Sequence, residues 1–172
     1  PILFFLTAYS YAADGDYAVS KIPKKMLENA NAVKRIEQQS FIINNERSTV
    51  MRQFYAITIL NEKADEHAGL EVYYDKLTSI NSISGVLYNA AGVQIKKIKT
   101  KDLQDYSAVS DNSLAEDSRV KAYDFNYKVY PYTVEYEIEV SNNNTFMFPG
   151  WIPQEGEFLS VEKSDYSVVF PE

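Results

Sequence analysis

The chain has 172 residues, 45% of them hydrophobic and 24% charged, and this composition predicts one folded domain with a core of its own. It contains no cysteine and a single histidine, so a disulfide framework, a thiolate zinc site, a cysteine triad and a three-histidine metal site are excluded within it. The net charge of −7 repels phosphate backbones, and we therefore expect no nucleic-acid partner.

Residues 1–12 form an apolar run of about the length of the hydrophobic region of a secretory signal peptide. Ser10 and Ala12 have the spacing that signal peptidase recognises, and residues 13–16 turn abruptly polar. We interpret residues 1–12 as a signal-peptide remnant, which predicts export to a bacterial periplasm or beyond. The run is too short to span a bilayer, so no transmembrane segment is expected. The alternative that residues 2–6 form a buried strand stays open, because a short apolar run does not distinguish the two.

Residues 13–31 are predicted to be a lead-in segment that contains one short helix. Pro23 suits the first turn of a helix, and apolar side chains follow it at near-helical spacing. The pattern predicts a helix over residues 20–31 that docks on the core through one face. That face consists of Ile22, Met26, Leu27, Ala30 and Val33.

Beyond the helix the pattern changes to the period of two that is typical of strands. Residues 36–43 and 50–60 predict two strands joined by a turn at residues 44–47, since β-branched and aromatic runs flank a cluster of turn residues there. Residues 62–67 form a polar break. Residues 70–74 are apolar again, and both a strand and a single helical turn fit them.

A second hairpin is predicted from residues 80–88 and 93–99. Gly92 lies in the short loop between them and can adopt the positive φ angle that such a loop needs. The second of these strands carries alternating lysines, which are typical of a solvated face or a protected sheet edge. These lysines are Lys96, Lys97, Lys99 and Lys101.

Residues 100–119 are polar and rich in acidic side chains, and they predict a surface loop. Carboxylates invite comparison with a calcium site. However, the oxygen-bearing residues at 111–113 are consecutive rather than alternate, and no glycine or terminal glutamate completes an EF-hand loop. We expect no metal and no other cofactor.

The last part of the chain is predicted to supply further strands at residues 120–127, 132–140 and 158–170. Together with the two hairpins they predict an all-β fold, an antiparallel β-sandwich with a large twisted sheet, in which residues 32–170 form a single domain and residues 171–172 begin a linker. The strand 132–140 alternates strictly, so one face is expected to be buried and the other wet. The buried set is Tyr132, Val134, Tyr136, Ile138 and Val140, and the wet set is Thr133, Glu135, Glu137 and Glu139.

No catalytic residues are expected in this chain. Neighbouring carboxylates such as Glu135 and Glu137 lie on the predicted wet face, whereas a glycosidase needs a desolvated pair that flanks one bond. His67 lies in the polar break without a second histidine or a cysteine as partner. We therefore do not expect the chain itself to be an enzyme.

Aromatic residues are abundant, with 14 Tyr, 9 Phe and one Trp. Most of them are expected to belong to the core of the sandwich. Tyr and Trp also anchor partner proteins and stack on sugars, because they combine a large apolar area with a polar tip. Trp151 lies on a predicted loop beside prolines and a glycine, and with Tyr130 and Tyr132 it forms our candidate set for binding a partner or ligand.

Several segments resemble a known family. They are the sequences at residues 31–35 (Asn-Ala-Val-Lys-Arg), 130–137 (Tyr-Pro-Tyr-Thr-Val-Glu-Tyr-Glu), 151–154 (Trp-Ile-Pro-Gln) and 160–164 (Ser-Val-Glu-Lys-Ser). The chain resembles the family called domain of unknown function 3857 over roughly residues 30–171. The hairpin loop at residues 89–92 also fits that family.

The resemblance implies an accessory β-sandwich that precedes a transglutaminase-like domain in exported proteins of Gram-negative bacteria. The triad of such a domain would lie downstream of this chain, since the chain has no cysteine. The leading hypothesis is a non-catalytic module that positions its transglutaminase-like, cysteine protease-like neighbour or supplies contacts to a protein or glycan substrate. The alternative is an autonomous glycan- or peptide-binding β-sandwich.

Overall fold

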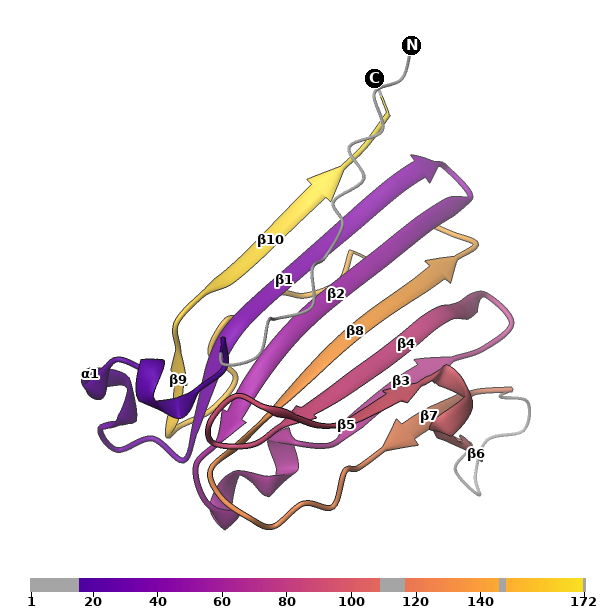
Figure 1. Ribbon diagram of the computed structural model, residues 1–172. Helices are drawn as coiled ribbons and strands as arrows, with labels where there is room; N and C mark the ends of the chain where they lie inside the picture. Colours follow the sequence, from indigo (N-terminus) through magenta and orange to yellow (C-terminus); the bar gives the residue numbers. More distant parts are fainter. Residues whose placement is uncertain (1–15, 109–116, 146–147, 172) are drawn as a thin grey trace.

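The structure is a computed structural model, which describes residues 16–108, 117–145 and 148–171. Figure 1 shows a large twisted sheet that runs diagonally across the molecule, with a smaller sheet near the β4 and β5 end. The two sheets enclose a common core. The predicted all-β sandwich with a large sheet is therefore confirmed. The predicted signal-peptide remnant at residues 1–12 lies outside the described residues.

The large sheet has seven strands in the order β10-β1-β2-β8-β4-β5, with β9 also paired to β1. From β1 to β5 every neighbouring pair is antiparallel, whereas β9 and β10 run parallel to β1. A parallel pairing needs a long connection, and the chain between β8 and β9 provides it. The strands are β1 (Ala32–Asn45), β2 (Ser48–Ile59), β4 (Thr78–Tyr88), β5 (Gln94–Lys99), β8 (Tyr132–Asn142), β9 (Leu159–Val161) and β10 (Ser164–Val169).

β9 and β10 follow one another along the same edge of β1, with a break between them at Glu162 and Lys163. Opposite this break β1 has an irregularity at Arg35, where its register with β2 shifts. The Arg35 Nε donates a hydrogen bond of 3.1 Å to Glu162 Oε1, and both side chains are largely buried. This ion pair therefore connects the segment between β9 and β10 to the irregularity in β1.

The small sheet has three antiparallel strands in the order β3-β7-β6, namely β3 (Leu70–Tyr74), β7 (Arg119–Tyr123) and β6 (Gln104–Ser107). The helices are short: η1 (Val19–Lys21), η2 (Glu62–His67) and η3 (Thr100–Asp102) are 3-10 helices, and α1 (Lys24–Leu27) is a single α-helical turn. None of the helices in the described residues has the length and hydrophobicity of a membrane-spanning helix.

Both predicted hairpins are confirmed. β1 and β2 pair along their length and are joined by a tight turn at residues 46–47. β4 and β5 are joined by a loop in which Gly92 has a φ angle of 78°, as the sequence predicts. Residues 70–74, for which two structures were open, form β3, and the strand segment predicted at residues 158–170 contains two short strands, β9 and β10.

The predicted helix over residues 20–31 is wrong for most of its length. Glu28 leaves the helix with an extended backbone, and Asn29 then adopts a φ angle of 58°, so the helix ends after one turn. Ile22 is buried, but it lies before the helix rather than on a helical face. The apolar side chains of this segment are therefore not arranged on one helical face. They belong to a mostly irregular segment, which packs on the sheet through Tyr17.

The predicted surface loop at residues 100–119 is also partly wrong, because η3 and β6 lie within it. Residues 109–116 of that loop lie outside the described residues. The predicted strand 120–127 starts at Arg119 and ends at Tyr123, after which Asn126 has a φ angle of 50°. Pairing of β6 with β7 is a long-range contact, which the local polar composition of β6 does not predict.

The main core lies between the two sheets, and β8 contributes the side chains predicted for its buried face. The prediction that the other face of β8 is wet is wrong at Thr133 and Glu135, whose exposed fractions are 0% and 1%. A second apolar cluster of Tyr17, Ala56, Val86 and Tyr88 covers that part of the sheet. The lead-in segment therefore closes the outer face of the sheet that the alternating pattern assigns to water.

Candidate functional site

Tyr130 and Tyr132, two of the three candidate binding residues, lie where the chain enters β8. Tyr132 is buried, and its ring packs at 5.6 Å from that of Tyr130. The Tyr130 hydroxyl donates a hydrogen bond of 2.7 Å to Asp65 Oδ1, and Lys128 Nζ donates one of 2.5 Å to Oδ2. These donors, Lys128 first, lower the pKa of Asp65 below its usual value. The two tyrosines thus form part of a corner that ties β8 to η2.

Trp151 lies against β10. Its ring stacks on that of Tyr166 with centroids 6.0 Å apart and an interplanar angle of 19°. Its indole Nε1 donates a hydrogen bond of 2.9 Å to Ser164 Oγ. The Ser164 hydroxyl in turn donates to Glu37 Oε2 at 2.6 Å, and Glu37 forms a buried ion pair of 3.2 Å with Lys34. Trp151 is therefore anchored to the sheet by both its ring and its N–H group.

The structure does not bring Trp151 together with Tyr130 and Tyr132. Trp151 stacks on a residue of β10, whereas Tyr132 begins β8, and strands β1 and β2 lie between them in the sheet. Three strand spacings correspond to about 14 Å. The three aromatic residues therefore do not form a single platform, although the part that each takes in binding stays a prediction.

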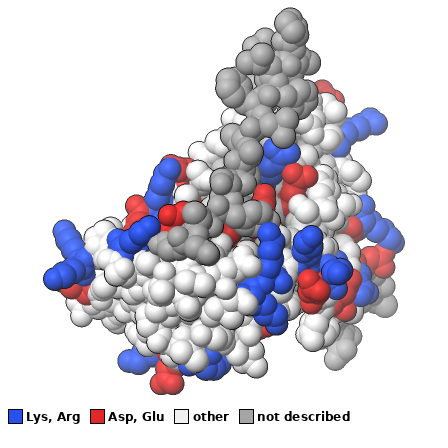
Figure 2. Space-filling view, in the orientation of Figure 1, with Lys and Arg blue, Asp and Glu red and all other residues white. Residues whose placement is uncertain are grey.

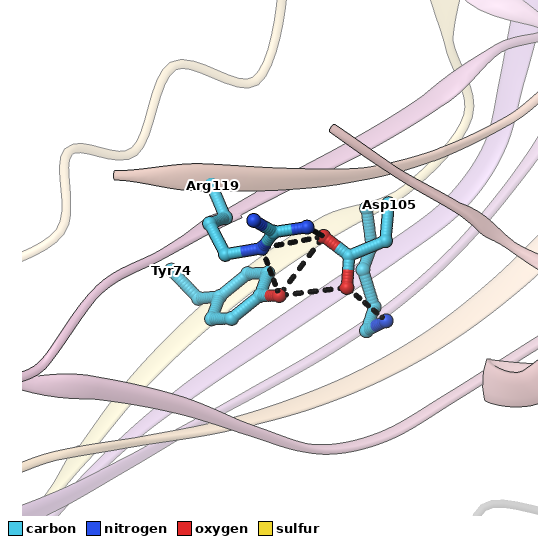
Figure 3. A network of polar contacts seen from close by, with 4 residues as sticks. Tyr74, Asp105 and Arg119 are labelled. Atoms are coloured by element: carbon cyan, nitrogen blue, oxygen red, sulfur yellow. Dashed lines mark hydrogen bonds and ion pairs between the residues drawn. The ribbon is translucent and has the colours of Figure 1, made fainter. Parts of the chain in front are cut away.

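A polar network that the sequence reasoning missed lies on the small sheet (Figure 3). Asp105 of β6 accepts hydrogen bonds of 2.9 Å from the Nε and Nη2 of Arg119 and from the Nζ of Lys121, both on β7. The hydroxyl of Tyr74 on β3 lies 2.9 and 2.8 Å from the two carboxylate oxygens. One carboxylate thereby connects all three strands of the small sheet.

These donors, Lys121 first and then Tyr74, lower the pKa of Asp105 to about 2. Asp105 and Lys121 lie directly opposite each other in the register of β6 and β7. They are far apart along the chain, and the intervening sequence predicts a loop, so no local signal pairs them. The network thus contains one carboxylate, that of Asp105, and two cations, Arg119 and Lys121, which both bond to it.

An open hollow of about 420 Å³ adjoins this network. Its lining includes polar side chains of both charges, and within it Lys76 forms an ion pair with Asp117. The lining residues are Tyr74, Asp75, Lys76, Ser107, Asp117, Ser118 and Arg119. Such a surface offers hydrogen bonds to a polar ligand. Lys76, Asp117 and Arg119 are engaged in ion pairs, and the Asp75 carboxylate accepts hydrogen bonds from the backbone N–H groups of Leu77 and Thr78.

The described residues contain no group of three or more His, Cys, Asp or Glu side chains arranged to hold a metal ion. His67 is half-buried at the end of η2 and lies 3.9 Å from Glu66 Oε1. Figure 2 shows lysine and arginine side chains interspersed with acidic ones on the face in view rather than a field of one sign.

An apolar surface lies along the end of β10 and the segment before β9. Phe148 packs on Phe41 of β1 at 5.1 Å between ring centroids, and Val168 lies opposite Phe41 in the register of β10. Next to them Trp151 covers Tyr166. We call the exposed apolar members of this surface the C-terminal strip. They are Phe148, Trp151, Val168 and Phe170, with exposed fractions of 59, 41, 38 and 72%.

Comparison with known proteins gives one family and two solved structures. The family model described as "Domain of Unknown Function with solved-structure structure (DUF3857)" matches residues 45–172. No curated protein matches the chain. The fold is similar to the crystal structure of a provisionally assigned protease from Parabacteroides distasonis, with a TM-score of 0.66 and 12% identity.

That match covers 83% of this chain and 29% of the other, so this chain spans less than a third of the length of that protein. A crystal structure of an M1 zinc metallopeptidase from Deinococcus radiodurans matches with a TM-score of 0.28 and 8% identity, covering 72% of this chain and 24% of the other. The similarity to the Parabacteroides structure concerns the fold.

Proposed function

Since the chain belongs to the DUF3857 family, we propose that it is a non-catalytic accessory domain of a larger exported bacterial protein. In this proposal the domain positions a transglutaminase-like, cysteine protease-like neighbour in the same polypeptide, or supplies contacts to that neighbour's protein or glycan substrate. The catalytic cysteine and histidine belong to the neighbour, because this chain has no cysteine.

The observation that carries the proposal is that the match with the Parabacteroides structure covers 83% of this chain but only 29% of that protein. Most of this chain superposes on 29% of a longer protein whose provisional assignment is protease. A fold that occupies less than a third of such a protein is what we expect of an accessory domain, with the chemistry located elsewhere.

The described side chains support the same assignment. Asp105, Asp65 and Glu37 are each held by cations, and in two of these clusters the hydrogen bonds lower a carboxyl pKa rather than raise it. General acids need a raised pKa near the working pH. The carboxylates therefore have the properties of structural ion pairs.

An autonomous glycan- or peptide-binding module is the rival function. Its candidate residues are spread over two separate places in the fold, and the ring of Trp151 is already stacked on Tyr166. An aromatic platform for sugars needs an accessible ring face. We favour the accessory role for this reason.

The first test is the intact mass of the protein purified from its source, with peptide mapping beyond Glu172 and before residue 14. The proposal expects a longer mature chain with a cysteine and a histidine in a following domain and with residues 1–12 removed. A mature chain that ends near Glu172 would contradict the accessory role and favour the autonomous module.

The second test compares the full protein with a version that lacks this domain. We expect the deletion to change the melting temperature of the remaining protein or its KM for a peptide substrate. Identical melting temperature and kinetics in the two proteins would contradict the proposal, because a domain that positions its neighbour must alter one of them.

A further inference from the structure

The two edges of the large sheet are protected differently. The edge strand β5 carries Lys96, Lys97 and Lys99, and charged side chains on an edge oppose pairing with another strand. At the other edge, β10 has no charged residue from Tyr166 onward, and the strand is followed by Phe170. One edge therefore resists a further strand, whereas the other does not.

The backbone of β10 also has hydrogen-bonding groups on the side away from β1, with which no described strand pairs. The Glu37 N–H donates to the Lys163 carbonyl at 3.0 Å, and β10 runs parallel to β1 with Glu37 opposite Ser164. In a parallel ladder alternate residues bond to the partner strand. The amides of Tyr166 and Val168 therefore point away from β1, and within the described residues no strand pairs with this side of β10.

The C-terminal strip lies beside this edge. Val168 is opposite Phe41, on the face of the sheet where Phe148 packs, and the exposed Phe170 follows the end of the strand. Val169 is opposite Ile42 and is exposed on the other face of the same edge. Contiguous exposed apolar surface next to an open edge is typical of an interaction site, since both the side chains and the backbone gain partners on binding.

We propose that an extended, apolar segment of the domain that follows this one in the same protein pairs with the free edge of β10 and covers the C-terminal strip. This inference rests on the proposed accessory function and adds the surface through which it acts. β10 is the last strand of the fold, so a segment that follows it emerges next to the free edge. Its effective concentration there is of the order of millimolar, which favours this occupant over a separate molecule.

The test uses the full protein and hydrogen exchange resolved at single amides. In the unchanged protein the Tyr166 and Val168 amides are expected to be protected, because they bond to the added strand. The double variant Val169→Lys with Phe170→Lys places two charges beside that strand, and both amides are expected to exchange about tenfold faster. The amides of β8 serve as an internal reference for the fold.

A matched variant controls for the added charge. Leu77→Lys with Val129→Lys also replaces two exposed hydrophobic residues by lysine, but both lie away from β10 along the chain, before β4 and before β8. We expect this variant to leave the exchange of Tyr166 and Val168 unchanged. Equal acceleration in both variants would overturn the proposal, because it would mean that charge alone loosens the edge.

Other results would also overturn it. Fast exchange of Tyr166 and Val168 in the unchanged full protein would leave β10 without a partner. Protection that rises with protein concentration, together with a dimer in sedimentation, would assign the edge to a second copy. Protection that is lost only on removal of residues 1–12 would assign it to the N-terminal segment.

The outcome for the edge is separate from the outcome for the function. If β10 exchanges freely while deletion of the domain still changes the melting temperature or the kinetics, the docking surface is wrong and the accessory role stands. If the mature protein has no following domain, the accessory role itself is wrong and the docking surface is wrong with it.

Discussion

Gly85 of β4 lies directly opposite Tyr136 of β8, and a Cβ atom at Gly85 would lie 2.8 Å from two carbons of the Tyr136 ring. The same atom would lie 3.0 Å from Cγ1 of Ile98 on β5. Both neighbours are buried in the core between the sheets. The absence of a side chain at Gly85 is therefore what allows the Tyr136 ring to lie across β4.

Gly85→Ala is expected to destabilise the protein by about 1–3 kcal/mol, because the rigid Tyr136 ring must move within a packed core. Urea unfolding measures the change in the free energy of unfolding. Gly150→Ala is the matched control, since a Cβ there meets nothing within 4 Å. An effect of Gly85→Ala no larger than that of the control would show that the ring relaxes freely.

Two buried tyrosine hydroxyls are expected to respond in opposite ways to replacement by phenylalanine. The Tyr136 hydroxyl donates a hydrogen bond of 2.8 Å to the Ala68 carbonyl, so Tyr136→Phe should cost about 1–2 kcal/mol of stability. The Tyr166 hydroxyl is buried without a hydrogen-bond partner among the described residues, so Tyr166→Phe should be neutral or stabilising. A clear loss of stability in Tyr166→Phe would contradict this reading of the β10 surface.

Ser164→Ala is expected to loosen the attachment of Trp151. It removes the acceptor for the indole N–H and a donor to the buried Glu37 carboxylate, and we expect a cost of about 1–3 kcal/mol. The emission of the single tryptophan should shift to longer wavelength, since the ring gains contact with water. Ser167→Ala on the same strand removes an exposed contact with Ser40 and a long hydrogen bond of 3.5 Å to the Gln39 carbonyl, and it should leave both stability and emission nearly unchanged.

Asp105 is expected to make stability depend on pH in the acid range. Its pKa is about 2 in the folded protein and about 4 in an unfolded chain, so the unfolded state binds more protons between these values. The stabilisation is present above the unfolded pKa and is lost as the pH falls through about 2. The difference in melting temperature between the protein and Asp105→Asn should therefore be constant above pH 5 or so and shrink at lower pH. A difference that does not change with pH would contradict this assignment.

The hairpins of the large sheet could be predicted because their signals are local. Alternating β-branched and aromatic residues define β1 and β2, and Gly92 has the positive φ angle that the loop between β4 and β5 needs. The edge formed by β9 and β10 gives no such signal. Glu37 and Ser164 lie side by side although 127 residues separate them along the chain.

The burial of Glu135 could not be predicted for a similar reason. Alternation in β8 describes only one strand, whereas the outer face of that strand is closed by Tyr17 from the lead-in segment and by Tyr88 from β4. The Asp105 network also joins residues from three strands, and two of these strands lie in segments whose local composition predicts a loop or leaves the structure open. Tertiary pairing, rather than local propensity, determines both features.

The parallel pairing of β1 with β9 and β10 has a consequence for biosynthesis. Of the described strands, β1 is the first to leave the ribosome, and the strands that complete its edge are the last, with Ile42 pairing with Val169. A nascent chain that stops before β9 therefore holds an open β1 edge, which is prone to pair with other chains. The large sheet is therefore complete only after β10 has been translated. A truncation that removes β9 and β10 is expected to leave the edge of β1 unpaired, although β1 is translated well before them.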